Sequence, residues 1–427
     1  MKKSISTLLA IFFFASQSDA QTWNEIPSGT NKTLNSVSFP SASVGYIVGN
    51  DSLILKTVDG GLSWNPLDLS NFNFAGTTNN FLSVQFLTDD IGYVTVGPYY
   101  GLYKTIDGGV NWTIENTIYA CFNHGLYFFD ENNGFLGGSG CFSGDIINKL
   151  ANGTWEETNI TPQFIQGYGM INNFDFWDDS LGLGTSGGGG AYFFRTTNGG
   201  TTWDTIPNTL TVNDEMTSVL FVDSSRVLAT YLHGQNGGFG VLLSMDGGLT
   251  WQDHMNSATF FYPSMHATHK SGNGHVYIGG QVQIPTNGVY SGMIYGSDDQ
   301  ITFWTYENVA RSIRDFDSYS DSVVFAVGEN GYIIVNQPLA GLSLDDNLID
   351  DLLLVFPNPS NGEIHITNNQ STLDEIQLFD ARGSEISYAT ISQKTNNEWS
   401  INNLKSGVYL LKIRSDNYWS SKKVVIF

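Results

Sequence analysis

Five acidic residues in predicted loops have side chains that could carry catalysis. Hydrolysis of a glycosidic bond uses two carboxyl groups that flank the scissile bond, one as acid and one as base or nucleophile. The candidates are Asp51, Asp145, Asp214, Glu215 and Glu329. They are scattered along the sequence without a pairing motif, and solvated loop acids explain them better. A polysaccharide hydrolase is therefore an alternative hypothesis rather than the first one.

Aromatic residues gather in predicted loops that are rich in Asn and Gly. Flat rings in such surroundings suit stacking on sugar faces or gripping a peptide. The alternative is that the rings pack their own long loops. The candidates for ligand binding are Tyr99, Tyr100, Phe142, Tyr168, Phe239, Tyr262 and Tyr290.

The two cysteines, Cys121 and Cys141, are expected to form a disulfide that closes one loop, because the chain begins like an exported protein. No CxxC or metal-type spacing is present, and His233, His266 and His269 are too dispersed to suggest a metal site. We therefore expect neither a metal nor another cofactor. No Ser-His-Asp arrangement is recognisable either.

A repeat positions these residues. Tryptophans stand at 64, 112, 155, 203, 251 and 304, so that successive spacings are 48, 43, 48, 48 and 53. Four of them end a turn with two glycines, which we call the Gly-Gly turns: residues 56–64, 104–112, 195–203 and 244–251. A period near 48 accommodates four short strands with their turns, which is one blade of a β-propeller.

The Gly-Gly turns resemble the Asp-box turns of the Asp-box propellers. Together with the Gly45–Gly49 and Gly92–Gly97 lead-ins, the pattern is similar to that of the photosystem II assembly/stability factor type. The Asp or Asn accepts backbone N–H groups within its own turn, and each Trp is expected to be buried between blades. These turn residues are therefore predicted to be structural: Asp59, Trp64, Asp107, Trp112, Asn198, Trp203, Asp246 and Trp251.

Seven blades are predicted, because inner strands are expected near Leu34, Leu82, Gly125, Asn173, Thr217, Ser264 and Ile313. The last unit lacks a closing strand, and residues 22–26 read like one, so the N-terminal strand should close the last blade. In such a ring the Gly-Gly turns share one face. The inter-blade loops and second-to-third strand loops share the opposite face, here called the loop face. The candidate acids and aromatic rings fall on the loop face.

The two ends of the sequence read as export signals. Residues 1–20 have the basic start, apolar run and small-residue end of a signal peptide, and no later run is long enough to span a membrane. After the propeller (21–337) and an acidic linker (338–351), residues 352–427 predict a small antiparallel β-sandwich. Its motifs, among them Phe356–Pro359 and Gly407–Ile413, resemble the type A C-terminal sorting domain of the type IX secretion system. The resemblance implies delivery by that machinery to the outer cell surface or the medium.

The amino-acid composition argues against several functions. With 18 Lys and Arg against 41 Asp and Glu, the net charge of −23 makes nucleic acid an unfavourable partner. Sialidases share the Asp box but resemble one another in an arginine triad, which this propeller lacks. The chain is thus predicted to be all-β: a seven-bladed propeller with a C-terminal sandwich. Its predicted function is non-catalytic binding of a glycan or protein through the loop face. A hydrolase and a purely structural surface component are the alternatives.

Overall fold

The computed structural model divides the chain into two compact units, Met1–Gly341 and Leu342–Phe427. It describes residues 23–70, 72, 79–97, 101–116, 122–139, 145–161, 170–187, 191–208, 210–211, 213–233, 238–256, 264–283, 290–297, 301, 304–320, 322–336, 353–356, 360–368, 373–380, 386, 389–395, 398–415 and 418–427.

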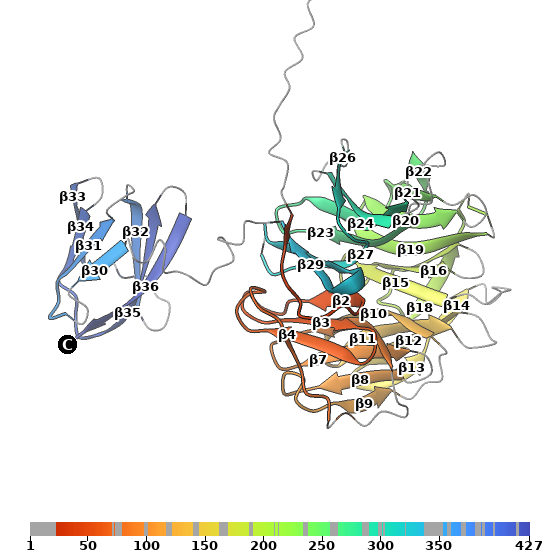
Figure 1. Ribbon diagram of the computed structural model, residues 1–427, viewed down its shortest axis with the longest axis horizontal. Coiled ribbons are helices and arrows are strands. Elements are labelled where there is room, and N and C mark those ends of the chain that lie inside the picture. Colours follow the sequence, from red (N-terminus) through yellow and green to blue (C-terminus); the bar gives the residue numbers. More distant parts are fainter. Residues whose placement is uncertain are drawn as a thin grey trace, which may run out of the picture. The chain divides into compact units, whose positions relative to one another are not determined.

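Seven sheets of the first unit, antiparallel apart from one added strand in blade four, are the blades of a β-propeller (Figure 1). The first three, given from the innermost strand outward, are β2 (Leu34–Ser38), β3 (Gly45–Gly49), β4 (Leu53–Thr57) and β5 (Asn65–Pro66); β6 (Asn80–Phe86), β7 (Gly92–Gly97), β8 (Gly101–Thr105) and β9 (Thr113–Asn116); and β10 (Phe122–Asp130), β11 (Asn133–Ser139), β12 (Asp145–Ala151) and β13 (Thr154–Glu157).

The next three blades are β15 (Met170–Phe176), β16 (Gly182–Gly187), β17 (Tyr192–Thr196) and β18 (Thr202–Ile206); β19 (Asp214–Phe221), β20 (Val227–His233), β21 (Phe239–Ser244) and β22 (Gln252–Asn256); and β23 (Ser264–Lys270), β24 (Val276–Gln283), β25 (Tyr290–Ser297) and β26 (Trp304–Val309). The seventh is β27 (Ile313–Ser318), β28 (Val324–Gly328), β29 (Tyr332–Val335) and β1 (Asn24–Glu25), with the short 3₁₀ turn η1 (Glu329–Gly331) before β29.

The ring closes as the sequence predicts. Each innermost strand contacts the next one in chain order, and β27 contacts β2 again; Figure 1 shows the last blade beside the first. The N-terminal strand β1 pairs with β29, with Asn24 opposite Val335 and Glu25 opposite Ile334. The prediction that the N-terminus completes blade seven is confirmed, and the outer edge of β29 is thereby covered.

Blade four carries a strand that the repeat does not predict. β14 (Asn159–Thr161) follows blade three in the sequence but pairs in parallel with β18, the outermost strand of blade four. This fifth strand lies outside the four-strand period, because it is formed by the connection between two blades. It covers the β18 edge and links neighbouring blades by backbone hydrogen bonds.

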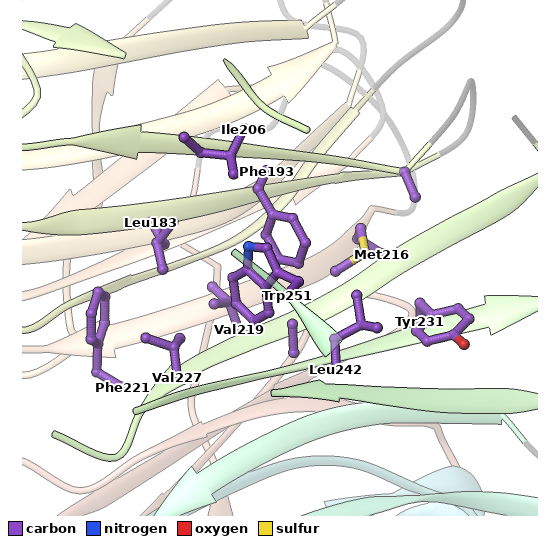
Figure 2. Packing of buried hydrophobic residues seen from close by; sticks show 12 residues of the cluster. Leu183, Phe193, Ile206, Met216, Val219, Phe221, Val227, Tyr231, Leu242 and Trp251 are labelled. Carbon is purple, nitrogen blue, oxygen red and sulfur yellow. The ribbon is translucent and has the colours of Figure 1, made fainter. Parts of the chain in front are cut away.

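Apolar side chains from adjacent blades share one core at each interface. Between blades four and five, the Trp251 ring stacks on Phe193 with a centroid distance of 3.9 Å and an interplanar angle of 3° (Figure 2). Trp203 likewise meets Phe135 of the preceding blade at 5.6 Å and is completely buried. Large rings at every period thus hold each blade against its neighbour.

The second unit is a small antiparallel β-sandwich. One sheet has the order β30 (Leu353–Phe356), β31 (Ile364–Asn368), β34 (Glu398–Asn402) and β33 (Thr390–Thr395), and the other β32 (Leu373–Asp380), β35 (Gly407–Ser415) and β36 (Tyr418–Ile426). Ile366 and Ile401 of the first sheet share a buried cluster with Leu378 and Leu411 of the second. In the part of the chain that is described, no helix is long and apolar enough to cross a membrane.

Candidate functional site

A cavity of about 810 Å³ lies at the centre of the propeller ring. Residues from all seven innermost strands line it, so the cavity belongs to the whole ring rather than to one blade. A pocket of this size lies within the range that holds small ligands or a side chain of a larger partner. We call it the central cavity.

A β-bulge at the same place in each innermost strand supplies much of the lining. The pairing with the second strand shifts after Leu34, Phe81, Asn123, Ile171, Met216, Met265 and Ile313. A bulge breaks the in-out alternation of a strand and re-aims the extra residue. Seven residues at these bulges, from six of the blades, line the central cavity: Asn35, Leu82, Ser83, Asn172, Thr217, His266 and Arg314.

The bulges lie near the beginning of each innermost strand, which follows directly after an inter-blade loop. The ring of bulged residues therefore lies toward the loop-face end of the central cavity. Among them, the amide groups of Asn35 and Asn172 donate to backbone carbonyl oxygens of the next blade, Phe81 and Met216, both at 2.7 Å. Their Oδ1 atoms remain as acceptors.

Deeper in the cavity, side chains of one blade accept backbone N–H groups of the next. Asp315 Oδ2 accepts the Val37 amide at 3.0 Å, and Asp317 Oδ2 accepts the Phe39 amide at 2.6 Å. The second oxygen of each accepts the amide of the following residue on β27. Burial raises the pKa of Asp315 to about 6 and that of Asp317 to about 7, although these hydrogen bonds oppose the shift.

Two of the candidate catalytic acids are held by partners. Asp214 is 6% exposed; its Oδ2 accepts both the N–H and the hydroxyl of Thr211, and its Oδ1 lies 3.1 Å from His233 Nδ1. Burial acts to raise the pKa of Asp214, but these hydrogen bonds outweigh it and lower the pKa. Glu329 Oε1 lies 2.8 Å from Arg314 Nη2.

The other three candidate acids differ in their position in the fold and in their surroundings. Asp51 is exposed, in a turn with a φ of 53°, and Asp145 is the first residue of β12. Glu215 lines the central cavity, and no described residue donates a hydrogen bond to it or forms an ion pair with it. The structure thus places Glu215 in the lining of the central cavity and pairs Glu329 with the lining residue Arg314, whereas Asp51 lies in an exposed turn.

The aromatic candidates fall mostly outside the described residues: Tyr99, Tyr100, Phe142, Tyr168 and Tyr262. Tyr290 is placed as the first residue of β25. Phe239 is corrected from a surface ring to a core ring, because it is 1% exposed and packs on Tyr295 at 5.6 Å. Cys121 and Cys141 also lie outside the described residues, so their disulfide stays a prediction.

On the opposite face, the polar groups of the Gly-Gly turns are occupied within the turns. Asp107 Oδ1 accepts the Asn111 amide at 2.9 Å and the Thr105 hydroxyl at 2.9 Å, while Gly108 and Gly109 supply the positive φ angles. Cations of the preceding blade bind the glycine carbonyls of the turns; Lys56 Nζ lies 3.1 Å from Gly108 O, and Arg195 Nε lies 2.8 Å from Gly247 O. Within the described ranges, no group of three or more His, Cys, Asp or Glu could hold a metal ion.

Apart from Glu215, the lining of the central cavity was missed by sequence reasoning, which considered the loops. A usable signal was present, because a polar residue follows the first buried residue of several inner strands, as in Leu34-Asn35, Ile171-Asn172 and Ile313-Arg314. Aligning the repeats at this position would have grouped these residues.

Two family models match parts of the chain. Residues 354–427 match the secretion system C-terminal sorting domain, and residues 15–118 match the photosynthesis system II assembly factor YCF48. Comparison with curated proteins gives no match. The sorting domain indicates that the chain is exported, to the cell surface or as a secreted protein, and that its tail interacts with the type IX secretion machinery.

Solved structures show the same propeller fold. YCF48 bound to D1 peptide is 16% identical with a TM-score of 0.54, covering 73% of this chain and 96% of that one. YCF48 from Cyanidioschyzon merolae is 19% identical with a TM-score of 0.55, covering 73% and 98%. An ancestral GH74 enzyme is 11% identical with a TM-score of 0.51, covering 95% and 63%. A fold with such different members does not decide between binding and catalysis.

Proposed function

We propose that this exported propeller is a non-catalytic binding protein that takes a glycan or protein ligand at the loop-face end of its central cavity. The observation that carries the proposal is the ring of bulges, which directs polar side chains from successive blades toward one cavity. Bulges are frequent where a strand re-aims a side chain at a functional site.

The acids support binding over hydrolysis. A two-carboxylate hydrolase needs a pair of acids free to transfer protons or attack the sugar. Asp214 is occupied by Thr211 and His233, and Glu329 by Arg314. Among the described lining residues Glu215 has no comparable second acid, since both oxygens of Asp315 and of Asp317 already accept backbone amides.

The YCF48 structure with a bound D1 peptide adds a precedent for a polypeptide ligand on this fold. The sorting tail of the present chain points to a partner at the cell surface or in the medium.

The test is a glycan array and a pulldown with the mature full-length protein, repeated with Asn35→Ala and Thr217→Ala. Glu157→Ala, an exposed change on β13, is the control. We expect a ligand that the control retains and at least one cavity variant loses. If neither assay detects a ligand, the proposed binding function is contradicted. Release of reducing sugar that Glu215→Gln abolishes would establish the hydrolase instead.

A further inference from the structure

Glu215 is the carboxylate of the central cavity whose oxygens are not already used. It is the second residue of β19, opposite Leu232, and its side chain is partly buried. Burial raises the pKa of Glu215, and no hydrogen bond or opposite charge among the described residues opposes this effect. Asp315 and Asp317 differ, since both oxygens of each accept backbone amides.

The position of the Glu215 side chain is fixed by its neighbours. A Cβ atom placed on Gly187 would lie 2.4 Å from Glu215 Cγ and 2.6 Å from Asn172 Nδ2. The glycine therefore leaves the space that the glutamate and the amide occupy side by side. Asn172 Nδ2 donates one hydrogen to Met216 O, and no hydrogen bond joins it to Glu215 among the described residues.

The other ionisable groups of the cavity do not neutralise Glu215. The Arg314 guanidinium is paired with Glu329. Burial, and to a lesser degree the charge of Arg314, lowers the pKa of His266 to about 4, so its imidazole is neutral at pH 7. Among the described lining residues, no cation pairs with Glu215, so its negative charge is uncompensated. Removing a carboxylate from water without a partner is costly, and a bound cation would offset that cost.

We infer that the central cavity binds a positively charged Lys or Arg side chain of a polypeptide partner, with Glu215 as its ion-pair partner. The inference rests on the proposed binding function and specifies its ligand. A neutral sugar would donate hydroxyl hydrogens to Glu215 but would leave its charge uncompensated. The aromatic residues of the described lining are engaged in packing and present no free flat face for stacking on a sugar: Phe316 is 5% exposed, and Tyr127 packs against Phe129 and Phe176.

The test uses the mature full-length protein and two peptides, acetyl-Gly-Gly-Lys-Gly-Gly-amide and the same peptide with an acetylated lysine amine. Isothermal titration calorimetry should show binding of the first and an affinity at least about tenfold lower for the second, because charged hydrogen bonds are worth that much. Glu215→Gln should weaken binding of the charged peptide to the same extent. Glu157→Gln, which removes the same charge from an exposed site, should change it less than twofold.

Two further measurements separate a loss of binding from a loss of folding and test the position of the Glu215 side chain. Glu215→Gln should leave the melting temperature unchanged or raise it, since a neutral amide replaces a desolvated carboxylate. Gly187→Ala keeps the charge but displaces the side chain, and should also weaken binding.

Equal affinity for the two peptides, or full affinity in Glu215→Gln, would overturn the inference. If a neutral oligosaccharide binds and the lysine peptide does not, the proposed binding function stands and the cationic ligand is refuted. If no ligand binds in any assay, both fail.

Discussion

Removing the N-terminal strand should destabilise the propeller alone. The variant is a mature chain that begins at Ser28 and lacks β1, compared with one that begins at Gln21. Ile26 is 2% exposed and its amide donates to Ile333 O at 2.9 Å. Trp23 packs against Tyr277 at 5.9 Å and Phe316 at 6.1 Å.

The size of the effect follows from these contacts. Loss of a buried isoleucine costs about 2 to 5 kcal/mol. The two ring contacts of Trp23 together add about 1 kcal/mol, and the hydrogen bonds of the two paired residues together add about 1 kcal/mol. A destabilisation of about 5 kcal/mol is therefore expected, which in a domain of this size lowers the melting temperature by roughly 10 °C.

Differential scanning calorimetry measures the melting temperature of the propeller. The C-terminal sandwich serves as an internal reference, because it has its own core and should melt at the same temperature in both chains. Glu25→Ala is the matched control: it keeps the β1 backbone and removes only an exposed pair with Arg311 at 3.7 Å. A melting temperature within about 2 °C of the parent chain would refute the reasoning that β1 contributes to closure.

Three further predictions concern the blades. Trp203→Ala should cost about 3 to 5 kcal/mol in urea unfolding, because the ring is completely buried, whereas Trp177→Ala at a 44% exposed site should cost little; similar losses would contradict the packing argument. Asp107→Ala should cost about 1 to 2 kcal/mol through the turn hydrogen bonds, measured the same way, and no loss would show that the turn forms without them. Asp315 and Asp317, with pKa values raised to about 6 and 7, bind protons more tightly in the folded than in the unfolded protein. Stability should therefore fall as the pH rises from about 4 to 7. Asp317→Asn should flatten this dependence in thermal melts, and an unchanged slope would count against it.

The propeller could be predicted because its periodic signals are local. The Gly-Gly turns and the Trp spacing repeat in the sequence, and residues 22–26 match the strand that blade seven lacks. β14 could not be predicted in the same way, since it pairs in parallel with β18 and lies outside the period. Its pairing depends on where the ring places two segments that are about forty residues apart.

The candidate site could be predicted only in part. The loop face was the expected location, but the central cavity depends on bulges, which break the alternation that sequence reasoning uses. Phe239 shows the same limit, because an aromatic residue beside a loop of Gly and Asn can belong to the loop or to the strand that follows. Glu215 stood out as an acid, whereas the lack of a partner for it among the described residues depends on the side chains that surround it in three dimensions.

In the proposed binding function, the seven bulges also separate the residues that stabilise the ring from those that would contact the ligand. The residue added at a bulge lies outside the alternation that fills the blade interfaces, so positions such as Leu82, Thr217 and His266 can vary while the cores between blades stay intact. Asn35 and Asn172 are more constrained, since each also bonds a neighbouring blade. A combinatorial library at the bulge positions would accordingly yield proteins of similar stability with different ligands. Natural sequence divergence at these positions could change the ligand in the same way.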